Sequence, residues 1–167
     1  ISETAACLEA LEGGIDKNNV HIAIQLFVTL TEFCQGPSAE NQITLSRTKL
    51  CESINYIWRL KTLHVEHANI NKLKESILGT LLSLLEGNTS PAIPRHILNT
   101  LNFDELIKDF KLVSGFVDSN LGDDPKADLD EHTETIINEG FLLYFLFKTL
   151  ESYDSDRKVR GSKYFSF

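Results

Sequence analysis

The sequence predicts an all-α fold, and three observations carry that prediction. Apolar residues recur three and four positions apart along most of the 167 residues, which is the spacing of one face of a helix. Breaks that contain glycine or proline separate these segments, as at Gly36-Pro37. No stretch of useful length alternates apolar and polar residues, as a half-buried strand would. We therefore expect about eight helices.

The first four helices are expected at about 2–12, 19–35, 38–45 and 50–60. Ser2 can cap the first helix, and the glycine pair after residue 12 ends it. The second ends before Pro37, because proline disfavours helical geometry in the residue before it. Ser38 can cap the third. The fourth begins near Leu50 and carries an apolar face.

The last four helices are expected at about 70–85, 91–101, 103–117 and 130–153. The fifth has one continuous apolar stripe, formed by Ile70, Leu73, Ile77, Leu81 and Leu84. The sixth follows Pro91 and is short. The seventh has the most regular amphipathic pattern, and Asn102 can cap it. The eighth contains "GFLLYFLF" (140–147), which is apolar all round.

Successive amphipathic helices joined by short turns predict an irregular armadillo-like α-solenoid or a helical bundle. We expect one helical domain over residues 1–153. An acidic linker at about 118–130 lies inside it, where seven acids and one lysine occur between Asp118 and Glu134. Residues 154–167 form a polar tail.

Composition excludes two classes of partner. The net charge of −8 and the pI near 5.1 argue against binding to nucleic acid. The longest apolar run, at 140–147, is too short to cross a membrane, so we expect no direct membrane insertion. Such a run usually lies at the centre of a helical core, and the rival interpretation is a surface that docks a partner.

The widely spaced Cys7, Cys34 and Cys51 fit reduced, buried thiols of a cytosolic protein.

The sequence carries no recognisable catalytic pattern. It has no phosphate-binding glycine loop, nucleophile elbow or HExxH segment, so we expect that the protein is not an enzyme. "HVEH" at 64–67 places His64 and His67 three residues apart, a spacing that could supply metal ligands on a helix. Because no further ligand lies nearby in the sequence, we interpret these residues as solvated turn residues.

A second weak pattern lies in the tail. Asp154 and Asp156 have the spacing of the first two calcium ligands of an EF-hand loop. That loop requires glycine at its sixth position and glutamate at its twelfth, where this chain has Val159 and Phe165. The tail is therefore a degenerate EF-hand relic at most, and we do not expect it to bind calcium.

The second helix carries one carboxylate, Glu32, one turn before its end. Apolar residues cover roughly two-thirds of its circumference, which predicts an inner helix packed on more than one side. The remaining narrow strip holds His21, Gln25, Thr29 and Glu32. Glu32 either faces water or contributes to a polar site that another segment covers. Periodicity favours the first alternative but does not separate the two.

Four segments together resemble a known family. "LFVTLTEFCQGPSAENQ" (26–42) resembles a signature shared by inositol trisphosphate receptors and ryanodine receptors, in their homology-associated cytosolic region. "LLSLLEGN" (81–88) is similar to the ryanodine receptor form, and "NFDELIKDF" (102–110) to a helix of both branches. "INEGFLLYFLFKTL" (137–150) looks like a later helix of the inositol trisphosphate branch. The mixture does not select one branch.

The resemblance implies a cytosolic regulatory and coupling segment of a tetrameric intracellular calcium-release channel. In that family, such segments lie on the cytosolic face of the endoplasmic or sarcoplasmic reticulum and relay ligand and calcium signals to the pore. The implied partners are other domains of the same channel, assembled as a homotetramer. A free-standing helical adaptor that binds a protein partner is the alternative.

The resemblance also implies a role for Glu32. The matching glutamate of the family is one ligand of a shared calcium site, and segments outside this chain supply the others. Calcium takes six to eight oxygen ligands, and one carboxylate supplies at most two. We therefore expect calcium as a ligand of the full channel and no bound cofactor in this chain alone.

Overall fold

The computed structural model describes residues 1–60, 65–88, 90–120 and 130–154, and within these ranges it is helical without strands. The elements are α1 (Ser2–Glu9), a 3₁₀ turn η1 (Ala10–Gly13), α2 (Val20–Cys34), α3 (Ala39–Ser46), α4 (Leu50–Arg59), α5 (His67–Leu85), α6 (Ala92–Thr100), α7 (Phe103–Asn120) and α8 (Glu131–Glu151). The all-α prediction is confirmed, and all eight expected helices are present.

The capping hydrogen bonds predicted for Ser2 and Ser38 are not formed. Ser2 lies inside α1, because the backbone N–H of Ala5 already donates to the carbonyl of Ile1 at 2.8 Å. Ser38 precedes α3, but its side chain makes no capping hydrogen bond. By contrast, Asp130 caps α8 by accepting from the N–H of Thr133 at 2.7 Å. The carboxylate satisfies an N–H that has no partner within the helix.

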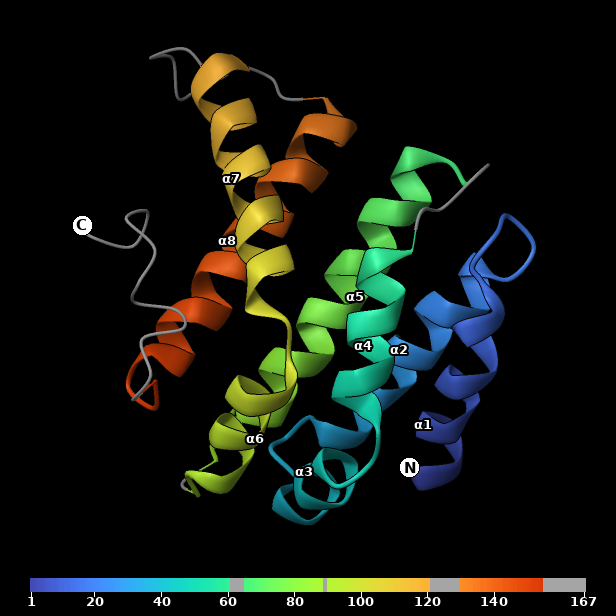
Figure 1. Ribbon diagram of the computed structural model, residues 1–167, viewed down its shortest axis with the longest axis vertical. Coiled ribbons are helices and arrows are strands. Elements are labelled where there is room, and N and C mark those ends of the chain that lie inside the picture. The colour runs from blue at the N-terminus through green and yellow to red at the C-terminus, as the bar shows by residue number, and fades with distance from the viewer. Residues whose placement is uncertain (61–64, 89, 121–129, 155–167) are drawn as a thin grey trace.

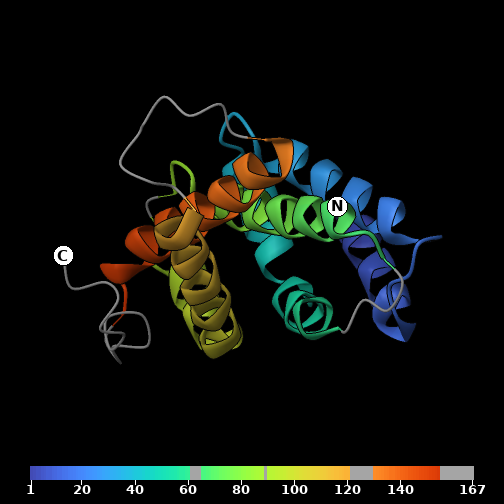
Figure 2. The same cartoon turned by 90° about the horizontal axis from the view of Figure 1, so that it is seen from above.

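The helices stack in two layers. Figures 1 and 2 show α2, α5 and α8 side by side in one layer, with α1, α4 and α7 in the other. In the first layer, α5 contacts α2 on one side and α8 on the other. The short helices α3 and α6 lie at the same end of the molecule (Figure 1). Repeated stacking of helix pairs fits the α-solenoid alternative of the predicted fold.

The core follows the length of α5. The buried side chains of α5 pack between those of α2 and α8. The fully buried residues of these three helices include Phe27, Leu30, Ile77, Leu78, Leu81, Leu143, Leu146 and Phe147. The predicted central position of the 140–147 segment therefore holds for one face only. Phe141 is 61 % exposed and Phe145 is 51 % exposed.

Other expectations have mixed outcomes. Cys34 and Cys51 are buried, but Cys7 is exposed, contrary to the expectation of three buried thiols. Among the described residues, every helix is too short or too polar to span a bilayer. Most of the acidic linker and the tail beyond residue 154 lie outside the described residues.

Candidate functional site

Glu32 lies on the exposed side of α2. Thr29 and Gln25 are its neighbours on the predicted polar strip, and the Thr29 hydroxyl donates to the Gln25 carbonyl at 2.8 Å. The Glu32 side chain makes no hydrogen bond or ion pair with any other described residue. Its carboxylate is therefore free to bind a ligand or partner that approaches α2 from outside.

The buried face of α2 is narrower than predicted. Its buried side chains are Val20, Ala23, Ile24, Phe27, Leu30 and Cys34. The predicted packing of α2 on more than one side is observed, but Val28 and Phe33 are each more than one-third exposed. The reason is that α2 contacts α5, α1 and α3, which leaves its remaining side open.

Hydroxyl groups join α2 to α5 beneath this surface. The hydroxyls of Thr31 and Thr80 lie 3.0 Å apart. Thr80 is fully buried, and its hydroxyl also lies 3.0 Å from the carbonyl oxygen of Phe27. Buried polar groups that are hydrogen-bonded across two helices fix the relative register of those helices.

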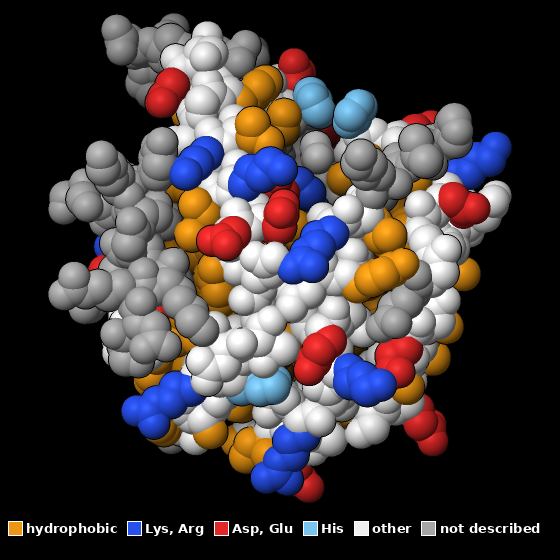
Figure 3. Space-filling view, in the orientation of Figure 1, with side chains coloured by type: hydrophobic (Ala, Val, Ile, Leu, Met, Phe, Trp, Pro, Cys, Tyr) orange, Lys and Arg blue, Asp and Glu red, His pale blue; other side chains and the backbone are white. Residues whose placement is uncertain are grey.

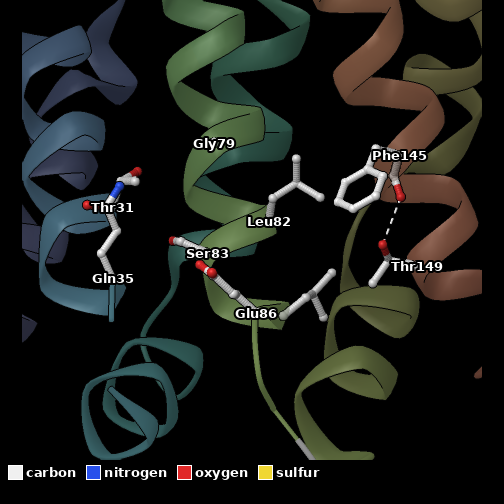
Figure 4. Close-up of a pocket in the computed structure, with 9 residues that line it drawn as sticks. Thr31, Gln35, Gly79, Leu82, Ser83, Glu86, Phe145 and Thr149 are labelled. Carbon is white, nitrogen blue, oxygen red and sulfur yellow. Dashed lines mark hydrogen bonds between the residues drawn. The ribbon is translucent and has the colours of Figure 1, made fainter. Parts of the chain in front are cut away.

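A groove runs between α2 and α8, with α5 as its floor. We call it the α2–α8 groove; it has a volume of about 530 Å³ and a mainly apolar lining. The lining residues are Thr31 on α2 and Gln35 directly after it, Gly79, Leu82, Ser83 and Leu85 on α5 and Glu86 directly after it, and Phe145 and Thr149 on α8 (Figure 4). Glu86 is its only charged lining residue among those described. Glu32 is exposed on α2 but is not one of the residues that line this groove.

Two of the segments that carry the family resemblance meet at the end of this groove. Gln42 is 1 % exposed, and its amide nitrogen donates to the carbonyls of Ser83 and Glu86, at 2.8 Å each. Pro37 lies against Gly87, whose φ is +61°. The segment after Glu32 therefore satisfies carbonyl groups at the C-terminal end of α5.

A second polar cluster joins α5, α7 and α8. Lys74 Nζ lies 2.7 Å from Asp109 Oδ2 and 3.2 Å from Glu139 Oε1. The same ammonium stands 5.4 Å from the ring centre of Trp58. Burial alone would lower the pKa of Lys74, but the carboxylates of Glu139 and Asp109 raise it above its ordinary value. Burial raises the pKa of Glu139, although Lys74 offsets part of that effect.

Sequence patterns did not indicate this cluster, because its members lie on three separate helices. Lys74 is 35 residues from Asp109 and 65 from Glu139. The one signal in the sequence is Glu139 itself, an acidic residue directly before the apolar segment 140–147. It does not identify a partner.

The other sequence candidates gain no support as metal sites. His67 is exposed at the start of α5, whereas His64 lies outside the described residues. Asp154 is buried just beyond α8, and Asp156 also lies outside them. Within the described part of the chain, no group of three or more His, Cys, Asp or Glu side chains could hold a metal ion.

Comparison with known proteins supports the family suggested by the sequence. Residues 1–58 match the family model described as RyR and IP3R homology associated. The match covers 58 of the 167 residues. The match includes α1, α2 with Glu32, α3 and nearly all of α4. Searches of curated proteins and of solved structures gave no match.

Proposed function

We propose that this chain is a cytosolic regulatory and coupling segment of a tetrameric intracellular calcium-release channel. The segment is not catalytic, and it lies on the cytosolic face of the endoplasmic or sarcoplasmic reticulum. It relays ligand and calcium signals to the pore through contacts with other domains of the same channel. Its relation to the receptor family over residues 1–58 supports the class of protein.

The observation that carries the calcium role is the exposure of Glu32 without a partner. A carboxylate with no internal ion pair is available to a cation, but it supplies at most two of the six to eight oxygens that calcium takes. The remaining ligands must come from segments outside the chain. Calcium then favours the arrangement in which those segments meet α2, and this coupling transmits the signal.

Two measurements test the calcium role. Calorimetry on the 167-residue chain should detect no micromolar calcium binding; micromolar binding that Glu32→Gln abolishes would contradict the shared site. In the complete channel protein, Glu32→Gln should raise the calcium concentration for half-maximal opening on the order of tenfold, because one charged ligand is lost. Glu40→Gln, which changes an exposed carboxylate on α3, is the matched control and should leave that concentration unchanged.

The alternative function is a free-standing helical adaptor. The exposure of Phe141 and Phe145 favours it, because large aromatic side chains on a surface are typical of sites that bind protein. The length of the parent chain distinguishes the two functions. Several membrane spans downstream would support the channel, whereas a short parent chain without them would support the adaptor.

A further inference from the structure

The α2–α8 groove is kept open by a glycine that packing within the chain does not require. Gly79 lies inside α5, on the floor of the groove. A Cβ atom built there would meet no heavy atom within 4 Å. Glycine in a helix interior costs stability relative to alanine. Its absent side chain instead allows the backbone of another molecule to approach α5 closely.

The apolar surface extends beyond the groove along α8. Phe145 lines the groove, and Phe141 stacks on it one turn earlier, with ring centres 6.3 Å apart and planes within 10°. Both rings are more than half exposed. From Phe141 to Thr149 the ridge spans about 12 Å of helix axis, at about 1.5 Å for each residue. An elongated ligand would cover this ridge, whereas a compact small molecule in the groove would leave Phe141 exposed.

Glu86, an exposed carboxylate, is the one charged residue of the described groove lining. Lys148, three residues after Phe145 on α8, pairs with Glu151 at 3.2 Å. On the face formed by α4, α6 and α7, acidic and basic side chains are interspersed (Figure 3). A ligand that brings lysine or arginine to the groove would therefore meet complementary charge.

From these observations we propose that the α2–α8 groove binds a basic amphipathic helix. Its apolar side packs on Leu82, Phe145 and Phe141, its backbone passes close to Gly79, and a lysine or arginine pairs with Glu86. A helix whose apolar face enters a hydrophobic groove is a recurrent mode of peptide recognition. This binding does not require calcium and does not depend on the proposed function of Glu32.

The test uses the isotope-labelled 167-residue chain in the presence of a calcium chelator. The probe is a 14-residue synthetic helix with leucine at positions i, i+3, i+4 and i+7 and with lysine on its flanks. A scrambled peptide of the same composition and an analogue with glutamate in place of lysine are the peptide controls. The amphipathic basic peptide should shift the amide resonances of Thr31, Gly79 and Phe145, and the two controls should not.

Variants of the chain locate the binding. Gly79→Leu fills the groove and should weaken binding at least tenfold while the melting temperature is unchanged or higher. Gly79→Ala, which adds only a Cβ, should weaken it less. Gly115→Leu is the matched control, because Gly115 is an exposed glycine of α7 that also has open space around its Cβ position. Glu86→Gln should weaken binding of the basic peptide.

Three outcomes would overturn the proposal. Equal binding of the scrambled peptide would show attraction by charge alone, and unchanged binding to Gly79→Leu would place the peptide elsewhere. Resonance shifts of the groove residues with a small aromatic compound such as indole, but with no peptide, would assign the groove to small molecules instead. Because calcium is absent throughout, none of these outcomes bears on Glu32 as a calcium ligand.

Discussion

The ammonium of Lys74 and the carboxylate of Glu139, 65 residues apart in sequence, lie 3.2 Å apart in the interior of the fold. Asp109 completes the cluster from α7, at 2.7 Å from the same ammonium. Glu139 is 3 % exposed. A charge this deeply buried requires a partner, so the cluster holds α7 and α8 in one position on α5.

Removal of the lysine should destabilise the chain strongly. Lys74→Met leaves two carboxylates without their cation, and we expect a loss of about 3 kcal/mol in the free energy of unfolding at neutral pH. Urea unfolding followed by circular dichroism measures it. The double variant Lys74→Met/Glu139→Leu should recover part of the loss, because the unpaired buried charge is gone. Lys148→Met, which removes a more exposed pair with Glu151, should cost less than about 1 kcal/mol; equal losses would contradict the role of burial.

The buried carboxylate should also give stability a specific pH dependence. Because burial raises the pKa of Glu139, the folded chain keeps this proton at pH values where an unfolded glutamate has lost it. The free energy of unfolding therefore falls as pH rises from the ordinary glutamate pKa, about 4.3, through the raised pKa of the folded state. The free energy of unfolding of the wild type minus that of Glu139→Gln should therefore fall as pH rises over this range. A difference for Glu139→Gln that grows with pH would contradict the assignment.

The helices could be predicted from the sequence because their boundaries depend on local chemistry. Gly36 adopts a φ of +92° and Pro37 follows it, so the end of α2 is determined by two adjacent residues. The exposure of Glu32 on the α2 strip was also favoured by periodicity and is observed. Its calcium role rests on the family resemblance and stays a prediction.

The groove and the Lys74 cluster could not be predicted, because they depend on which helices become neighbours. The segment 140–147 is apolar all round, so periodicity alone does not tell that Leu143 faces the core and Phe145 faces outward. Likewise, the sequence alone indicates only that Gly79 lowers the stability of an amphipathic helix. Its place on the floor of a groove follows only from the positions of α2 and α8.

The contact between α7 and α8 should not tolerate a larger residue at Gly140. A Cβ there would lie 2.5 Å from Cγ1 of Val113, so the Val113 side chain or one of the two helices would have to move. We expect Gly140→Ala to lower the free energy of unfolding by about 1–3 kcal/mol, as overpacked cores do. Val113→Ala in the same chain should recover part of this loss, which a double-mutant cycle measures. Gly115→Ala, with no neighbour within 4 Å, should instead stabilise the chain by up to about 1 kcal/mol. If Gly140→Ala did not lower the free energy of unfolding relative to Gly115→Ala, the two helices would repack freely around the added methyl group.

The junction between the two family segments should depend on Gln42. Its amide nitrogen is the side-chain donor to the carbonyls of Ser83 and Glu86, at the end of α5. Gln42→Leu keeps the apolar part of the side chain but leaves buried carbonyl oxygen without that donor, so we expect a loss of about 1–3 kcal/mol. Hydrogen exchange should show faster opening of α3 and of the last turn of α5, while the amides of α8 near Leu143 keep their protection. Glu40→Gln, an exposed change on the same helix, should leave exchange unchanged. If Gln42→Leu instead accelerated exchange uniformly, the hydrogen bonds would support the whole fold and not this junction alone.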